Sequence, residues 1–390
     1  MNVAVLKSIT RRPPVILATL LVTAVLAFAG VNRLVYRFHE QEKALARHLY
    51  EHGLRAQNAG NPEAALGDFR AALGYSHDNF QYQLSLARAL RDTGRTAEAE
   101  SYLISLWERA PQDGAVNLAL GRLFAREQLF DKAIQYYHNA IYGFWPTDAD
   151  TRRRNAQFEL IEFLVQHQAY PQAQAELITM ASSLPNDPGF RLRAADLFAK
   201  AQDYAHALAQ YQEVLRVDHS NKAALYGAGQ TAFQLGRHRM AQDYLQNGLR
   251  LDPQNERARQ LLEIDNQVLQ SDFLARHISD RERLQRMRSA FLVAGERLDS
   301  CAKSKGIDLN PTSPAEGLPA LKSQWLEIKP KLQRLQRSGD GGMLDVLMDL
   351  VSEIERQTQA ECGNPQGLDY ALLLLSQDKD KDKDKAGVER

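Results

Sequence analysis

Two consecutive blocks of the chain decide its fold. Residues 46–79 read ARHLYEHGLRAQNAGNPEAALGDFRAALGYSHDN, and residues 80–113 read FQYQLSLARALRDTGRTAEAESYLISLWERAPQD. In both blocks the eighth position is small, the twentieth is alanine and the twenty-fourth is large and apolar. Between the small positions each block carries a turn, at Gly60 or Gly94. Because two helices approach closely only where side chains are small, each block predicts a hairpin of two antiparallel helices.

The 34-residue block recurs along the chain. Further blocks begin at residues 114, 154, 188 and 222, and only the step to the fourth block is longer, by six residues. Pro111, Pro185 and Pro253 stand where second helices should end. The twentieth position is alanine in all six blocks: Ala65, Ala99, Ala133, Ala173, Ala207 and Ala241. An ordinary helical bundle would not hold this phase, so the sequence predicts an α-solenoid of about six hairpins within residues 37–255.

This pattern is similar to that of the tetratricopeptide-repeat (TPR) family, whose 34-residue unit has the same small-residue and proline signature. The resemblance implies an all-α fold in which the first helix of each repeat lines a concave surface that binds other proteins. It also implies groove residues at the fifth position of each block. These are Tyr50, Leu84, Leu118, Phe158, Leu192 and Tyr226. All are apolar or aromatic, so a lysine and asparagine clamp for a peptide carboxylate is not expected.

Arginines gather beside the fifth positions of the second and third repeats. They are Arg88, Arg91, Arg122 and Arg126. With an apolar floor, they predict a groove that takes an acidic, partly apolar segment of a partner protein, because arginine binds carboxylates in a bidentate manner. In the alternative interpretation, these arginines are ordinary solvated surface residues.

An uncharged apolar segment lies near the N-terminus. Residues 13–32 carry no charge and match the length of a membrane-spanning helix. We expect a cytoplasmic tail at 1–12, a transmembrane signal-anchor helix at 13–36, and the bulk of the chain on the periplasmic side of the inner membrane. Two alternatives remain open. Ala27, Phe28 and Ala29 resemble a signal-peptidase site, which would release a secreted periplasmic adaptor. Flanking positive charges are nearly balanced, so an adaptor facing the cytoplasm is also compatible.

The region after the repeats shows a different organisation. We expect a capping or linking helix at 256–280, a small helical bundle at 281–376 and a disordered charged tail at 377–390, where alternating aspartate and lysine place like charges at i,i+4. In the first bundle helix, apolar residues from Leu284 to Cys301 recur at steps of three and four. Cys301 and Cys362 are hypothesised to form a disulfide, or else to be two unpaired buried thiols.

Composition and motifs narrow the function. Basic and acidic residues both number 48, so there is no net charge to attract nucleic acid. No nucleotide-binding, zinc-hydrolase, serine-hydrolase, EF-hand or haem-attachment motif occurs, and His48 and His52 lack a third metal ligand. We expect no catalytic, cofactor-binding or metal residues, no cofactor and no small-molecule substrate. The predicted function is a membrane-anchored protein-interaction scaffold in assembly or stabilisation of a cell-envelope complex. An alternative is an adaptor that recruits or carries an enzyme activity through the C-terminal bundle.

Overall fold

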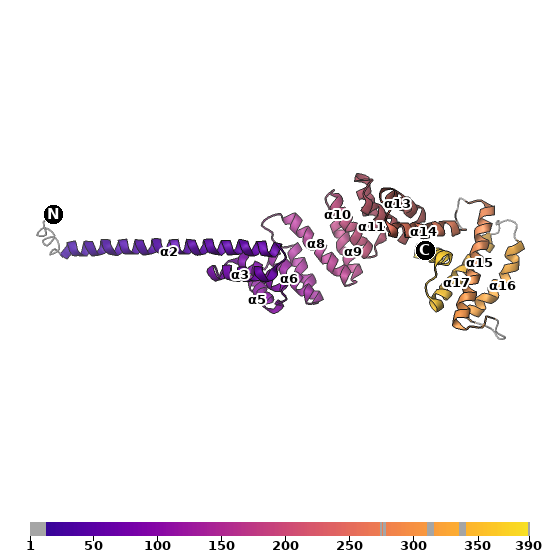
Figure 1. The fold of residues 1–390 in the computed structure, drawn as a ribbon, viewed down its shortest axis with the longest axis horizontal. Coiled ribbons are helices and arrows are strands. Elements are labelled where there is room, and N and C mark those ends of the chain that lie inside the picture. Colours follow the sequence, from indigo (N-terminus) through magenta and orange to yellow (C-terminus); the bar gives the residue numbers. More distant parts are fainter. Residues whose placement is uncertain (1–12, 274, 276–277, 310–315, 335–340, 389–390) are drawn as a thin grey trace. The chain divides into compact units, whose positions relative to one another are not determined.

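The chain is all-helical, as predicted (Figure 1). The computed structural model describes residues 13–273, 275, 278–309, 316–334 and 341–388. It comprises two compact units, residues 1–163 and 164–390, and their boundary falls inside one helix, α8 (Ala149–Gln166). The predicted cytoplasmic tail, residues 1–12, lies outside the described residues.

Unit 1 contains the first three repeats and the start of the fourth. Its helices are α2 (Pro13–Asn58), α3 (Pro62–Tyr75), α4 (Phe80–Asp92), α5 (Thr96–Arg109), α6 (Gly114–Arg126), α7 (Phe130–Ile141) and the first part of α8. Side chains of Asn61, Asn79 and Asp113 cap the helices that follow them by accepting backbone N–H bonds. Gly60 and Gly94 adopt positive φ in the turns between paired helices, where an L side chain would be strained.

The small-residue positions of the sequence pattern are the points of closest helix contact. A Cβ atom on Gly53 would lie 2.7 Å from the Phe69 ring, and one on Gly229 would lie 2.8 Å from Leu245. The glycine at the eighth position therefore makes room for the large residue at the twenty-fourth. All six alanines at the twentieth position are fully buried. The 34-residue pattern thus reports the packing inside each hairpin.

Unit 2 contains the remaining repeats. Its repeat helices are the end of α8, α9 (Tyr170–Ala181), α10 (Pro188–Lys200), α11 (Tyr204–Val217), α12 (Lys222–Gln234) and α13 (His238–Leu251). The next helix, α14 (Glu256–Ser271), begins 34 residues after α12 and packs against α13. The helical phase therefore continues one helix beyond the last complete repeat, although the small-residue signature ends at residue 255.

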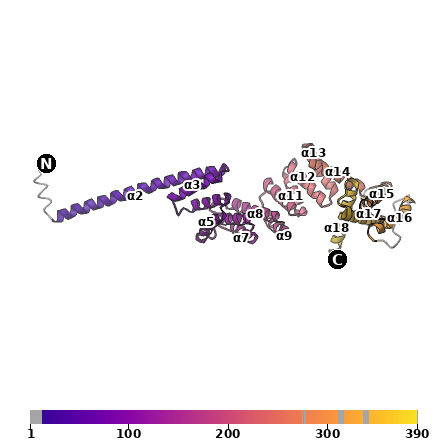
Figure 2. The same ribbon diagram turned by 60° about the horizontal axis from the view of Figure 1, so that its bottom comes forward.

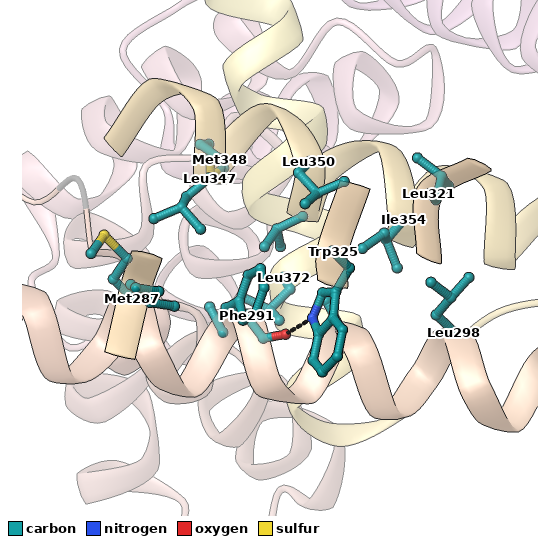
Figure 3. Packing of buried hydrophobic residues seen from close by; sticks show 14 of the residues in the cluster. Met287, Phe291, Leu298, Leu321, Trp325, Leu347, Met348, Leu350, Ile354 and Leu372 are labelled. Carbon is teal, nitrogen blue, oxygen red and sulfur yellow. Dashed lines mark hydrogen bonds between the residues drawn. The ribbon is translucent and has the colours of Figure 1, made fainter. Parts of the chain in front are cut away.

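The C-terminal bundle consists of α15 (Asp280–Lys305), α16 (Leu318–Arg334), α17 (Gly341–Cys362) and α18 (Gly367–Val388). Its core includes the predicted apolar stripe of α15, which is buried from Leu284 to Cys301 (Figure 3). The helix α18 packs against both α17 and α14. Leu372 joins the bundle core, while Leu374 lies against the cluster around Phe233 in the last repeat. α18 thereby connects the bundle to the end of the repeats.

Helix α18 extends to Val388, into the stretch 377–390 for which the sequence predicts a disordered charged tail.

The apolar segment and the first repeat share one helix. Within α2, the stretch Leu17–Asn58 contains a window of mean hydropathy 1.8 whose residues are not buried at all. By length and composition this stretch is long and apolar enough to cross a membrane. No break separates it from the first helix of repeat 1 (Figure 2). Ala46 is the first buried residue of α2 among those whose side chains are described. The predicted boundary between residues 36 and 37 is therefore not a structural boundary.

Candidate functional site

The predicted floor of the groove is mostly inaccessible. Leu84, Leu118 and Phe158 are only 1%, 8% and 0% exposed. Tyr50, Leu192 and Tyr226 are half-buried. The three buried residues cannot touch a partner, and the interpretation of the fifth position as an open apolar floor is wrong for them. Burying a large apolar side chain inside the fold is worth about 1.5–3 kcal/mol, which favours its use as core.

The two predicted tyrosines tie helices together. The Tyr50 hydroxyl lies 3.1 Å from Ser85 Oγ, and its ring stacks on Tyr82 with centroids 4.5 Å apart. The Tyr226 hydroxyl donates to the carbonyl oxygens of Gly248 and Asp252, at 2.9 and 3.2 Å. Their polar ends are therefore occupied, and only their rings remain for a partner.

The predicted arginines do come together in unit 1, but two are already paired. Arg122 makes a bidentate ion pair with Glu159 of α8, at 2.7 and 2.5 Å. Arg91 donates twice to Asp92, at 2.9 and 2.7 Å. Arg126 donates to the carbonyl oxygen of Arg91 at 2.7 Å. The positive charge that this surface presents to a partner is therefore smaller than that of four arginines without ion pairs.

Arg88 is the exception within this cluster. It is half-buried and donates one long bond, 3.5 Å, to the Ala115 carbonyl oxygen, while its Nε has no partner in the described part of the chain. Burial, and then the nearby positive charges of Arg122 and Arg91, lower the pKa of Arg88 to about 10. It still carries its charge at neutral pH, without a carboxylate beside it. An anion bound here would accept the hydrogen bond that Arg88 Nε does not otherwise make, and it would offset the repulsion from Arg122 and Arg91.

Unit 2 contains a groove that includes the predicted groove residue Tyr226 but is lined mainly by residues that the sequence analysis did not single out. Two adjoining cavities of about 470 and 360 Å³ share Gln230 and Gln234 of α12. The larger extends over α14 to Asn255, Arg257 and Gln260, and the smaller extends over α10 to Asp196 and Lys200. We call this the amide groove, because three glutamines and an asparagine line it. The sequence feature that could have predicted this groove is the pair Gln230 and Gln234, at the ninth and thirteenth positions of the sixth repeat.

The floor of the amide groove is fixed by Tyr211. Its hydroxyl donates to Asp196 Oδ1 at 2.6 Å, and burial together with this aspartate raises the pKa of the tyrosine. A Cβ atom on Gly227 would lie 2.3 Å from the ring, so only glycine allows the ring to lie there. The exposed amides above it, Gln230 and Gln234, can both donate and accept, as recognition of a peptide backbone requires.

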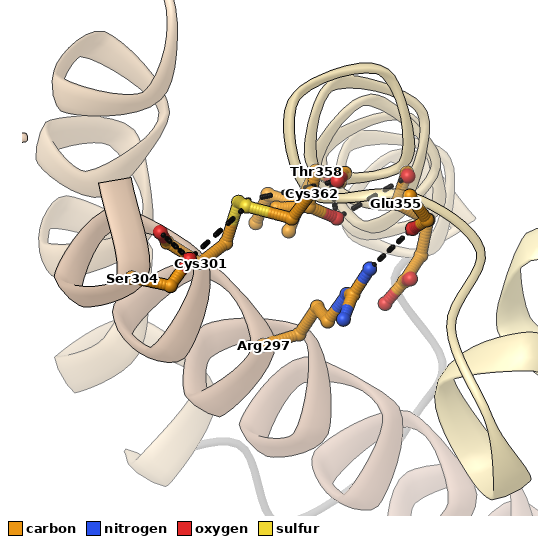
Figure 4. The surroundings of a disulfide bond; sticks show 8 residues. Arg297, Cys301, Ser304, Glu355, Thr358 and Cys362 are labelled. Carbon is orange, nitrogen blue, oxygen red and sulfur yellow. Dashed lines mark hydrogen bonds between the residues drawn. A yellow bond between two sulfur atoms is a disulfide. The ribbon is translucent and has the colours of Figure 1, made fainter.

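The hypothesised disulfide is present in the C-terminal bundle. Cys301 of α15 and Cys362 at the end of α17 are bonded, with their Cα atoms 5.9 Å apart (Figure 4). Ser304 Oγ lies 3.5 Å from Cys362 Sγ. In the same interface, Arg297 donates to the Gly363 carbonyl oxygen at 2.7 Å. The alternative of two unpaired thiols is wrong.

A buried carboxyl group lies on the same face of α17. Glu355 is 0% exposed, and neither of its carboxyl oxygens has a hydrogen-bond partner in the described ranges. Burial, reinforced by Asp369 of α18 and opposed by Arg297 of α15, raises the pKa of Glu355 to about 8. The side chain is therefore protonated at pH 7. Nothing in the sequence distinguished Glu355 from Glu353 and Glu361 of the same helix, which are half-buried and exposed.

Replacing Glu355 by glutamine is expected to raise the free energy of unfolding at pH 8 by about 1–3 kcal/mol. Between pH 4.5 and about 8 the folded chain holds a proton on Glu355 that the unfolded chain lacks, so stability falls as pH rises through this window. Glu355→Gln removes that dependence. Urea unfolding at pH 5 and pH 8 measures it, with the exposed Glu361→Gln as control. Equal pH dependence in wild type and Glu355→Gln would contradict the assignment.

The described side chains include no group of three or more histidines, cysteines, aspartates or glutamates placed to hold a metal ion. Of the two histidines weighed in the sequence, His52 bonds through Nδ1 to Asp68 Oδ2 at 2.6 Å. It is thus engaged in joining α2 to α3.

Comparison with known proteins agrees with the repeat architecture. Residues 56–123 and 192–258 each match the family described as tetratricopeptide repeat. A DnaJ homolog subfamily C member 3 homolog from Dictyostelium discoideum is 25% identical over 150 residues, which are 38% of this chain and 28% of that protein. The chain therefore spans less than a third of that relative's length.

Solved structures with a similar fold are more distant in sequence. Pseudomonas aeruginosa pilF is 18% identical, with 56% of this chain and 97% of that chain covered and a TM-score of 0.41. PilW, titled a type IV pilus biogenesis factor, is 16% identical, with 56% and 98% covered and a TM-score of 0.42. YrrB, titled a TPR protein with an unusual peptide-binding site, is 17% identical, with 49% and 96% covered and a TM-score of 0.39. Residues 56–123 and 192–258 are therefore tetratricopeptide repeats, and both segments lie within the series of helical hairpins.

Proposed function

We propose that this protein is a membrane-anchored scaffold that holds partner proteins through its repeats and acts in assembly or stabilisation of a cell-envelope complex. The observation that carries the proposal is Arg88, a half-buried charged group on a repeat surface that has no carboxylate partner among the residues the structure describes. A charge kept unpaired inside a fold costs stability, and a function in binding explains why it is kept. The exposed apolar part of α2 supplies the anchor.

The periplasmic location of the repeats is supported by chemistry in the C-terminal bundle. The Cys301–Cys362 disulfide fits an oxidising compartment, because cytosolic thiols are kept reduced. Retention of the anchor is supported by α2 itself, since Ala27, Phe28 and Ala29 lie inside an unbroken helix rather than in an extended segment. Intact mass of the protein from a membrane fraction tests retention, and a reporter fused to the C-terminus tests the side of the membrane. A mass that begins after Ala29 would support the secreted adaptor instead.

The ligand proposed for the arginine surface is an acidic, partly apolar segment. Arg88 and Arg126 offer guanidinium N–H groups there, while Arg122 and Arg91 are occupied by Glu159 and Asp92. A carboxylate at Arg88 would form a charge-assisted bond in a site partly shielded from water. The amide groove of unit 2 would hold the backbone of an extended segment, since its side chains match peptide N–H and C=O groups.

Arg88→Gln is expected to weaken binding of an acidic peptide about tenfold, the loss of one charged hydrogen bond of about 1.5 kcal/mol. The probe is an amidated peptide of alternating glutamate and leucine, compared with its glutamine–leucine counterpart by fluorescence anisotropy. Wild type should prefer the acidic peptide, and Arg88→Gln should abolish the preference. Arg55→Gln, an exposed arginine at the end of α2, is the matched control. An unchanged preference in folded Arg88→Gln would refute the carboxylate site.

A further inference from the structure

We propose that one edge of unit 1 rests on the bilayer surface, an inference that depends on the membrane anchorage proposed above. The edge consists of three turns, at residues 75–80, 109–114 and 141–149. Each turn joins the second helix of one repeat to the first helix of the next. We call this surface the turn edge.

Direct contacts place the three turns side by side. The Arg109 guanidinium lies 5.7 Å from the centre of the Phe80 ring, and Arg109 donates to Gln83 Oε1 at 3.0 Å. These contacts join the first turn to the second. The Phe144 N–H donates to the Gln112 carbonyl oxygen at 2.7 Å, and the Gly114 N–H donates to the Phe144 carbonyl oxygen at 2.9 Å. That short bridge joins the second turn to the third.

The direction of α3 brings the turn edge back toward the apolar part of α2. The two helices are antiparallel, with His52 bonded to Asp68 and Tyr50 beside Phe69 (Figure 1). Because the helices are antiparallel and His52 lies opposite Asp68, the residue seven positions after Asp68, Tyr75, lies opposite the residue seven positions before His52, which is Leu45. The first turn of the edge therefore lies level with Leu45.

The distance from Leu45 to Phe38 is slightly greater than the thickness of a headgroup layer. Exposed large apolar side chains of α2 continue to Phe38, which is 58% exposed. At a helical rise of roughly 1.5 Å per residue, Leu45 lies roughly 10 Å beyond Phe38 along α2. The polar layer on each side of the hydrocarbon core is roughly 5–8 Å thick. Because α2 has no break between Phe38 and Leu45, the first turn of the edge is held just beyond this layer, and the contacts described above tie the other two turns to it.

The chemistry of the turn edge fits a bilayer interface. Tyr142 and Phe144 are 77% and 65% exposed. Their loop is nevertheless well anchored, since the buried Trp145 donates from Nε1 to the Ala140 carbonyl oxygen at 2.8 Å and Arg153 donates to Gly143 O at 3.1 Å. Exposed aromatic rings on a fixed loop are costly in water and favourable at the level of lipid headgroups.

Charge on α2 complements this surface. Glu40 pairs with Lys43 and Glu42 pairs with His39, whereas Arg33 and Arg37 have no ion pair among the residues that the structure describes. These arginines lie at the end of the apolar segment, where lipid phosphates would meet them. The turn edge itself carries the exposed aspartates Asp78 and Asp148, so its contact with lipid rests on its aromatic side chains rather than on charge.

A depth measurement tests the proposal. Full-length protein is reconstituted in phosphatidylcholine vesicles that carry a headgroup-attached quencher, and a fluorescent label is placed on Asp78→Cys or Thr147→Cys in the turn edge. Both native cysteines are in the disulfide and remain unlabelled. Ala59→Cys, in the turn at the opposite end of repeat 1, is the control, roughly 30 Å from Phe38 along α2. Labels at 78 and 147 should lose most of their fluorescence, and the label at 59 should keep it.

An insertion into α2 tests whether the quenching depends on the distance between the turn edge and the membrane. Seven helix-forming residues added between Lys43 and Ala44 lengthen α2 by two turns, roughly 10 Å, with little rotation. Quenching at 78 and 147 should then fall toward that at 59. If the protein floats with vesicles but 147 is quenched no more than 59, the turn edge does not touch lipid, while anchorage stands. If the protein does not float with vesicles, the proposed anchorage is wrong, and this inference with it.

Discussion

Trp325→Ala is expected to lower the free energy of unfolding of the C-terminal bundle by about 3–5 kcal/mol, the range for removing a large aromatic from a core. Trp325 is 5% exposed, and its ring stacks on Phe291 with centroids 5.0 Å apart (Figure 3). Its Nε1 donates to the Phe291 carbonyl oxygen at 2.9 Å. Gly295 has no side chain, and a Cβ atom there would lie 2.5 Å from the indole. The surrounding helix is therefore shaped around this ring and cannot easily close over the cavity.

Hydrogen exchange of amides in α15 and α17 measures this loss locally, since a chain of two units need not unfold in one step. Trp325→Phe retains an aromatic ring but loses the hydrogen bond and part of the volume, so an intermediate effect is expected. Leu326→Ala, at a neighbouring exposed position, is the control. Protection in Trp325→Ala equal to that in Leu326→Ala would show that the indole is not the centre of this core.

Removing the disulfide is expected to cost about 4 kcal/mol. Cys301 and Cys362 are 61 residues apart, and opening a loop of this length restores chain entropy to the unfolded state. Both cysteines are replaced by alanine, which leaves no free thiol. The folded helices retain other contacts, including the bond from Arg297 to Gly363, so the bundle should still form but unfold at lower urea.

Urea unfolding of wild type and the double variant, each with and without reductant, measures this effect. Reductant should bring the wild type to the stability of the variant and leave the variant unchanged. A difference below about 1 kcal/mol would mean that the loop is already restricted in the unfolded chain, or that the folded bundle is strained by the bond.

The repeat fold was predictable because its signal is local and periodic. Gly53 and Phe69 belong to one hairpin, and the same pair of positions recurs as Gly121 with Tyr137 and Gly229 with Leu245. A single pair of this kind would predict little, but its recurrence at the same positions of several blocks predicts the repeat fold. The apolar stripe of α15 was predictable for the same reason, since helical periodicity alone decides which side chains share a face.

The candidate site was less predictable, because its state depends on residues distant in sequence. Arg122 and Arg88 looked alike in the sequence, yet Arg122 is neutralised by Glu159, 37 residues away, and Arg88 is not. The apolar fifth positions predict a groove floor, whereas Leu84 and Phe158 are buried in the core. Whether an apolar residue on a helix faces a neighbour or a groove depends on how the next hairpin is stacked.

The sequence by itself determined the helical hairpins and the apolar segment of α2, because the period and the length of an apolar run are local properties of the chain, and it left the pairing of Cys301 with Cys362 as one of two alternatives. Only the tertiary structure decided that α18 returns to the end of the repeats, that Arg88 Nε has no hydrogen-bond partner among the described residues, and that contacts join three turns into one edge. These features arise from packing between elements far apart in the chain, where many alternatives have similar local patterns and differ only in which surfaces meet.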